Sequence, residues 1–128
     1  MELNKNTKIL LVIASIMMAF GVILGAFGAH MLKQFISDEL MAVYETGVKY
    51  HFFNTLGLFA IAFILNFKPS SKLLFVCGLL VFAGTLLFSV SLYALVILKI
   101  SWLGIITPIG GSLLVLAWFL TAYGIIKK

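Results

Sequence analysis

The stretch "ILLVIASIMMAFGVILGAFGA", residues 9–29, decides the fold because it is a long apolar run without a single charge. A helix needs about 20 mostly apolar residues to cross the hydrocarbon core of a bilayer. The run is also longer than the apolar segment of a signal peptide, which has about 7–15 residues. We therefore expect a membrane-spanning helix that is kept in the mature protein.

The composition of the whole chain agrees with a membrane environment. Its 128 residues are 63% hydrophobic and only 10% charged, and the mean hydropathy is +1.21. A soluble domain is about 45–50% apolar and about 25% charged, so this chain has more apolar surface than a soluble core can bury. The length fits one integral membrane domain covering residues 1–128.

Three further segments complete a set of four expected spans. Residues 73–98 and 102–126 are long and apolar, whereas the apolar part of the second segment, residues 50–67, is shorter and contains Asn54. The four spans are then about 9–29, 50–67, 73–98 and 102–126. Short connections at residues 68–72 and 98–101 make neighbouring helices antiparallel. The expected fold is therefore an all-α, up-down four-helix bundle in the membrane.

The second span is long enough if its helix begins upstream. Ser37 is a good N-cap, and Asp38 and Glu39 then occupy the first turn, where the helix dipole favours negative charge. This predicts one helix from about residue 38 to 67, with an amphipathic extension preceding the buried part. The alternative is a short interfacial helix that breaks at Gly47.

The lysines, which carry all the positive charge, predict the orientation. Six of them fall on the side that holds both termini, and three fall on the other side together with Asp38, Glu39 and Glu45. Lysine-rich loops stay in the cytoplasm, so both termini are expected to be cytoplasmic. The six are Lys5, Lys8, Lys68, Lys72, Lys127 and Lys128, and the three are Lys33, Lys49 and Lys99.

Small residues mark the faces where helices should pack closely. Gly21, Gly25 and Gly28 share one face of the first span, and Gly110 and Gly111 follow Pro108 early in the fourth. Close backbone approach through small residues drives helix association in lipid. We expect these glycines to pack inside the bundle. The alternative for the first span is a homo-oligomer interface, and the alternative for the fourth is part of a binding site.

A polar cluster is expected in the outer half of the bundle. Its candidate residues recur at helical spacing on the spans. An unpaired polar group in hydrocarbon is unfavourable by about several kcal/mol, so these side chains should form hydrogen bonds with one another. The cluster comprises His30, Tyr44, His51, Asn54, Ser89, Tyr93 and Thr107. Its role is either structural or functional.

Four short motifs give the chain a family resemblance. They are "LGAFGAH" at residues 24–30, "YETGVKYH" at 44–51, "LFSVSLY" at 87–93 and "ITPIGG" at 106–111, followed by Trp118. In this order they resemble the domain of unknown function 423 family of small four-helix bacterial membrane proteins. The resemblance implies an integral protein of the bacterial cytoplasmic membrane. It implies no established activity, so no catalytic residue is carried over.

The chain departs from the family pattern at two places. The second helix of the family usually reads tyrosine, glutamine, any residue, aromatic, histidine, whereas here His51 stands at the glutamine position and Asn54 at the histidine position. The third helix usually has glycine between two serines, and Val90 stands there. A mechanism that needs an imidazole at one fixed position of the second helix is therefore not expected.

These observations favour a binding protein over an enzyme. The chain has two histidines and four acids, and their spacing matches no catalytic, cofactor or metal motif. We expect no cofactor and no nucleic-acid partner, with membrane lipids as the surroundings. The expected function is non-enzymatic binding of a partner, a lipid or a small apolar molecule, and the alternative is an oligomeric transporter or channel for small solutes or ions.

Overall fold

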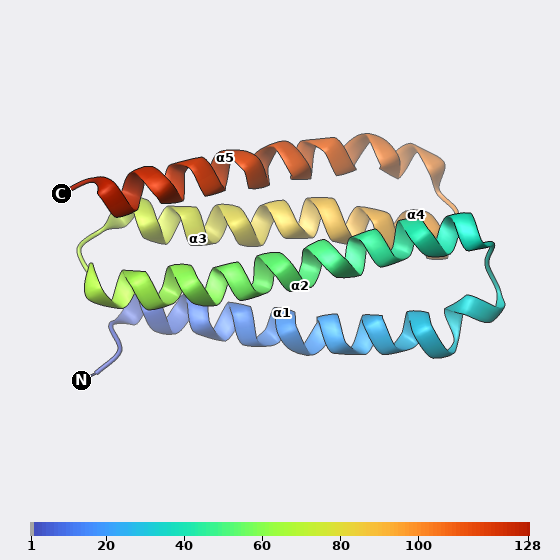
Figure 1. The fold of residues 1–128 in the computed structure, drawn as a ribbon, viewed down its shortest axis with the longest axis horizontal. Coiled ribbons are helices and arrows are strands. Elements are labelled where there is room, and N and C mark those ends of the chain that lie inside the picture. Colours follow the sequence, from blue (N-terminus) through green and yellow to red (C-terminus); the bar gives the residue numbers. More distant parts are fainter. Residues whose placement is uncertain (1) are drawn as a thin grey trace.

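The computed structural model describes residues 2–128, which form four antiparallel spans (Figure 1). The elements in chain order are α1 (Lys5–His30), the 3₁₀ turn η1 (Leu32–Gln34), α2 (Asp38–Phe67), α3 (Lys72–Thr85), the π-helical turn η2 (Leu86–Val90), α4 (Ser91–Leu98), the 3₁₀ turn η3 (Ser101–Ile105) and α5 (Ile106–Ile126). Each span is long and apolar enough to cross a membrane. The all-α membrane fold expected from the sequence is confirmed.

Side-chain caps begin three of the long helices. The side chains of Asn4, Ser37 and Ser71 each accept a hydrogen bond from the backbone amide three residues later, which satisfies an otherwise free donor of the first turn. The helix that begins after Ser37 continues without a break through Gly47 to Phe67. The single long helix is therefore confirmed, and the alternative with a break at Gly47 is wrong.

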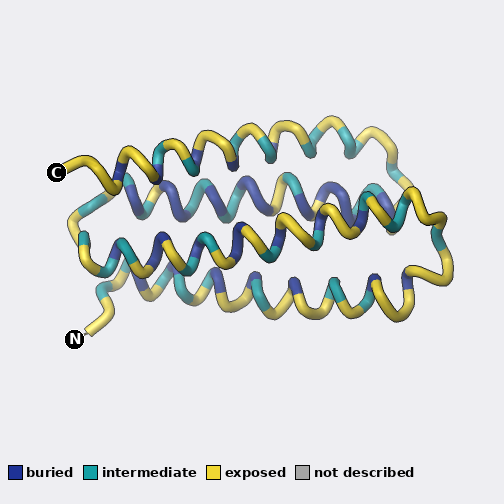
Figure 2. The backbone as a smooth tube through the Cα atoms, viewed as in Figure 1, coloured by how far each residue is buried: buried dark blue, intermediate teal, exposed yellow. Residues whose placement is uncertain are grey.

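The main packing follows the chain order of the spans, but α1 also touches α3 and α5 also touches α2. α1 packs on α2, α2 on α3, and α3 on α5, while over residues 2–128 α1 and α5 have no extensive contact (Figure 1). The two central spans bury a larger share of their residues than the two outer ones (Figure 2). Most of the surface of α1 and α5 is therefore left for lipid.

The third span contains a turn that sequence patterning does not predict. The π-helical turn η2 joins α3 to α4, and Gly110 of α5 packs directly against its backbone. A Cβ added at Gly110 would lie 2.4 Å from the backbone nitrogen of Phe88. Pro108 lies in the first turn of α5, where its missing amide costs no helical hydrogen bond. The "ITPIGG" segment is thus a close-packed corner.

Both termini lie at one end of the bundle, which we call the terminal end (Figure 1). There the Lys68 ammonium, in the turn between α2 and α3, donates to the carbonyl oxygens of Ile125 at 2.7 Å and Lys127 at 2.9 Å. A cation at a helix C-terminus satisfies the last carbonyls and complements the helix dipole. This contact fastens the end of α5 to the α2–α3 turn.

Candidate functional site

The centre of the predicted polar cluster is His51, whose two ring nitrogens both have partners. Nε2 lies 2.7 Å from the carbonyl oxygen of Met17 on α1, and Nδ1 lies 2.9 Å from the hydroxyl of Tyr93 on α4. A carbonyl oxygen only accepts, so Nε2 carries the hydrogen and donates it. In the neutral imidazole, Nδ1 then accepts from the Tyr93 hydroxyl. His51 thereby joins three of the four spans.

His51 lies deeper than the outer half of the bundle, where the sequence placed it. Its partner Met17 lies about 18 Å along α1 from Lys5 and about 20 Å from His30, at 1.5 Å per residue. The imidazole is therefore close to the middle of the first span, and 6% of the residue is exposed. A buried ionisable residue at this depth is a candidate functional group by default.

Glycines make room for the two tyrosines beside His51. A Cβ at Gly28 would lie 2.3 Å from the Tyr44 ring, and one at Gly47 would lie 2.8 Å from the Tyr93 ring. The Tyr44 hydroxyl donates to the carbonyl oxygen of Leu24, and the two tyrosine rings are 5.2 Å apart. Ring pairs at this distance add to the packing energy. The tyrosines and His51 form one continuous network, which we call the His51 network.

Ser89 completes this network from the π-helical turn. Its hydroxyl donates to the carbonyl oxygen of Gly47 at 2.8 Å, so it ties the third span to the second. Thr85, one turn earlier, instead donates to its own helix at Val81. The helix-internal bond is common for threonine in membranes, whereas the Ser89 bond crosses between helices.

Two of the predicted cluster residues belong to separate pairs. Asn54 accepts from the indole nitrogen of Trp118 at 2.9 Å, and a Cβ at Gly57 would lie 2.4 Å from the Trp118 ring. The Thr107 hydroxyl is 2.6 Å from that of Ser91. Both pairs join α5 to its neighbours, and neither touches the His51 network. The sequence indicated neither partner, although a glycine one turn after Asn54 was a signal of close packing.

His30 is not brought to the cluster. It is the last residue of α1, and it is exposed beyond the level of Tyr44. Its backbone carbonyl accepts from the side chain of Gln34. The expectation that the His30 side chain joins His51 and Tyr93 is therefore wrong, because Gly28 packs on Tyr44 of α2 while His30, in the same last turn of α1, is exposed. His30 is an interfacial residue.

The predicted packing glycines face neighbouring helices of the same chain. A Cβ at Gly21 would lie 3.0 Å from the Phe52 ring of α2, whereas one at Gly25 would have ordinary contacts at 3.6 Å or more. Gly111 contacts only the Phe88 side chain, at 3.4 Å or more. Close packing is thus required at Gly21, Gly28 and Gly110. Gly25 and Gly111 have room for a methyl group.

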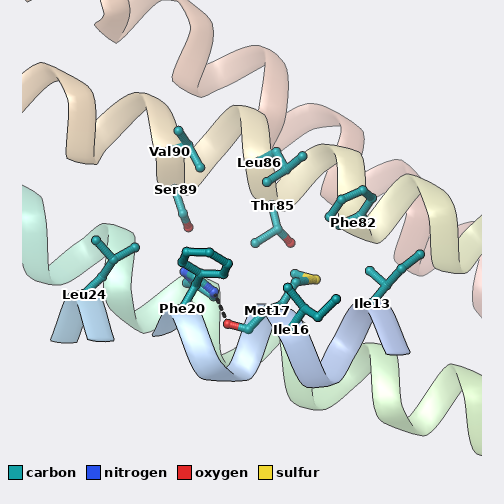
Figure 3. A pocket seen from close by; sticks show the side chains of 11 residues that line it. Ile13, Ile16, Met17, Phe20, Leu24, Phe82, Thr85, Leu86, Ser89 and Val90 are labelled. Carbon is teal, nitrogen blue, oxygen red and sulfur yellow. Dashed lines mark hydrogen bonds between the residues drawn. The ribbon is translucent and has the colours of Figure 1, made fainter. Parts of the chain in front are cut away.

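A lateral cleft lies between α1 and the third span (Figure 3), and His51 is among its lining residues. α1 and α3 touch where a Cβ at Gly78 would meet Leu10, and they diverge from there toward the level of Leu24 and Val90. The space between them, the α1–α3 cleft, has a volume of about 370 Å³. Its walls are mostly apolar, and the side chains of Phe20 and Leu86 border the space in the close view (Figure 3).

A second cleft lies between α2 and α5, with Phe88 of the third span among its lining residues. This α2–α5 cleft has a volume of about 740 Å³ and contains the Asn54–Trp118 pair. Tyr50 and Ser112 bring further polar groups to its walls. Across residues 2–128, no three histidine, cysteine or acidic side chains gather as metal ligands in either cleft or elsewhere.

Comparisons with known proteins agree with the family motifs. Residues 24–111 match the family described as "Protein of unknown function (DUF423)". The chain is 40% identical to the UPF0382 membrane protein YwdK of Bacillus subtilis, over 94% of this chain and 98% of that protein. It is 43% identical to the UPF0382 membrane protein SAB0533 of Staphylococcus aureus, over 81% and 82% of the two chains.

A more distant relative is named an inner membrane protein. The chain is 31% identical to the UPF0382 inner membrane protein YgdD of Escherichia coli, over 95% of this chain and 92% of that protein. No solved structure matches the chain significantly. The matched residues include the His51 network and the corner at Gly110. The chain therefore belongs to the DUF423 family of bacterial membrane proteins of unknown function.

Proposed function

We propose that this protein is a non-enzymatic membrane protein that binds one hydrocarbon chain of a membrane lipid in the α1–α3 cleft. The observation that carries the proposal is the cleft itself, which has about 370 Å³ of space and opens sideways into the bilayer. Sites for small molecules have volumes of about 300–1,000 Å³ and mostly apolar walls. A lipid chain is the apolar molecule that always surrounds this opening.

The chemistry of the cleft floor supports an apolar ligand. Both nitrogens of His51 and the hydroxyl hydrogens of Ser89 and Thr85 are already used in bonds within the protein. His51 is therefore held in place as part of the fold and is not free as a base. The floor offers an occupant van der Waals contact, which is the interaction that a hydrocarbon chain makes best.

Photo-crosslinking in nanodiscs tests the proposal. The probe is a phosphatidylcholine with a diazirine in one acyl chain, and labelled residues are mapped by mass spectrometry. We expect labels to concentrate on Ile16, Phe20 and Leu86, and Val90→Phe to remove most of them by filling the cleft. The matched control is Val22→Phe, an exposed position of α1 outside both clefts. Even labelling of all lipid-facing residues would contradict the proposal.

A second candidate function is transport of a small solute or ion by an oligomer. The depth of the His51 network favours it, because polar groups in the middle of a span mark many substrate pathways. It ranks second because no charged side chain lines either lateral cleft. Solute or ion flux into proteoliposomes tests this candidate. A flux that is lost in a folded His51→Leu variant would favour transport over lipid binding.

The orientation of the chain is part of the proposal. The six lysines of the terminal end, against three at the other end, support cytoplasmic termini. A green fluorescent protein fused to the C-terminus should fluoresce in cells, and alkaline phosphatase at the same position should be inactive. The opposite pair of results would reverse the orientation.

A further inference from the structure

A basic pocket lies at the terminal end, where α2 ends, α3 begins and α5 ends. Its volume is about 480 Å³, and four lysines line it: Lys68, Lys72, Lys127 and Lys128. No acidic residue is among the lining residues. The α1–α3 cleft does not include any of these residues, so the two sites stand independently.

Lys68 holds the pocket together instead of facing it as a free charge. Its ammonium donates to the carbonyl oxygens of Ile125 and Lys127, at 2.7 and 2.9 Å. This contact brings the end of α5 against the α2–α3 turn and places Lys127 and Lys128 beside Lys72. No hydrogen bond or ion pair engages the ammonium groups of Lys72, Lys127 and Lys128 within the described residues. Three positive charges are therefore gathered at one pocket and left for a ligand.

We propose that this terminal pocket binds the phosphate headgroup of an anionic membrane lipid. The lysines supply the charge, and basic pockets between membrane helices are suited to such headgroups. The apolar residues of the pocket favour a lipid over a soluble anion. Phe67 and Leu73 lie beside the lysines, and Phe67 is 61% exposed at the level where the spans end. A phosphate bound to the lysines would place its glycerol and first methylenes on this apolar surface.

Native mass spectrometry of the full chain in detergent tests the proposal. The probes are dioleoylphosphatidylglycerol and dioleoylphosphatidylcholine, added separately. We expect the first to bind more tightly, and Lys72→Gln with Lys127→Gln to weaken it about five-fold for each lysine removed, since a lysine at an anionic surface contributes about that factor. The matched control, Lys5→Gln with Lys8→Gln, removes the same charge from the same end outside the pocket.

The outcomes separate a specific site from general attraction. A loss in the pocket variant that clearly exceeds the loss in the control supports the site. Equal losses in both double variants would overturn it, as would equal binding of the two lipids by the natural chain. In a further measurement, inorganic phosphate is added to compete with bound phosphatidylglycerol. Displacement of phosphatidylglycerol by inorganic phosphate would show a soluble anion as the ligand and would also overturn the lipid assignment.

Discussion

The two lateral clefts of this bundle differ in whether their polar groups are paired within the protein or exposed. The α1–α3 cleft covers its polar atoms and pairs them inside the protein, as the bonds of His51 and Ser89 show. The α2–α5 cleft leaves polar side chains on its walls, including Tyr50, which is 43% exposed. The same bundle thus has one lateral cleft whose polar atoms are paired within the protein and another whose walls carry exposed polar side chains.

The π-helical turn η2 lines both clefts. Leu86, Ser89 and Val90 line the first cleft, and Phe88 lines the second. Its position is set by the backbone approach of Gly110. Substitutions at this contact should therefore disturb both clefts together, whereas a substitution deeper in one cleft should affect that cleft alone.

The largest effect is expected from Gly110→Ala. The new methyl group would lie 2.4 Å from the Phe88 nitrogen and 2.7 Å from the Leu87 carbonyl carbon, and backbone atoms cannot rotate away. We expect a loss of about 3 kcal/mol in the free energy of unfolding, the upper end for overpacking, measured by titration from mild detergent into dodecyl sulfate. Gly111→Ala, whose methyl would be at least 3.4 Å from its neighbours, is the control and should lose little. Equal losses would contradict this account of the corner.

His51→Leu should have the next largest effect, and it acts on the α1–α3 cleft alone. It removes two hydrogen bonds and leaves the Tyr93 hydroxyl without its acceptor. We expect a loss of about 2 kcal/mol, because a buried donor left unpaired costs about 1–3 kcal/mol. A double-mutant cycle with Tyr93→Phe should give a coupling energy of about 1 kcal/mol. A coupling near zero would show that the two side chains do not bond.

Asn54→Leu makes the corresponding change in the α2–α5 cleft. It leaves the Trp118 indole nitrogen without its partner, but Trp118 is only partly buried. We expect a loss of about 0.6–1.7 kcal/mol, the range for hydrogen bonds between membrane helices, together with a change in tryptophan fluorescence. The Trp102→Phe substitution removes the other tryptophan, so the fluorescence then comes from Trp118 alone. A loss larger than that of His51→Leu would reverse the ranking of the two networks.

His30→Ala should have the smallest effect, because His30 lies outside both clefts. Its side chain is exposed at the end of α1. Exposed substitutions usually change the free energy of unfolding by less than about 0.5 kcal/mol. A thermal unfolding scan in detergent should give the midpoint of the natural chain. A clear drop would mean that His30 reaches the polar network after all.

Part of the candidate site was predictable because helical spacing shows which residues share a face. The spacing of Tyr44, Gly47 and His51 on the second span correctly indicated one buried stripe, and the third span placed Ser89 and Tyr93 on its own stripe. Spacing gives the direction of a side chain around its helix. It does not give the depth of that residue beside a neighbour, which is why His51 was placed too near the outer surface.

Other contacts were not predictable because they join segments far apart in the chain. Lys68 bonds the last carbonyls of α5, Trp118 bonds Asn54, and Ser91 pairs with Thr107. Each residue alone has an ordinary interpretation as a loop lysine, a lipid-facing tryptophan or a helix-internal serine. Their partners are fixed only when the helices pack together in the bundle.

The sequence by itself determined the four spans, their antiparallel order and the Ser37 cap of the second, because these depend on hydropathy, length and local hydrogen bonding. The tertiary structure alone decided that the second and third spans are the more buried pair, that η2 is a π-helical turn, and that clefts lie between α1 and α3 and between α2 and α5. The physical reason is that lipid solvates every apolar helix face equally well. The choice of neighbour then depends on close packing at glycines such as Gly28 and Gly110, which sequence shows as small residues but not as contacts.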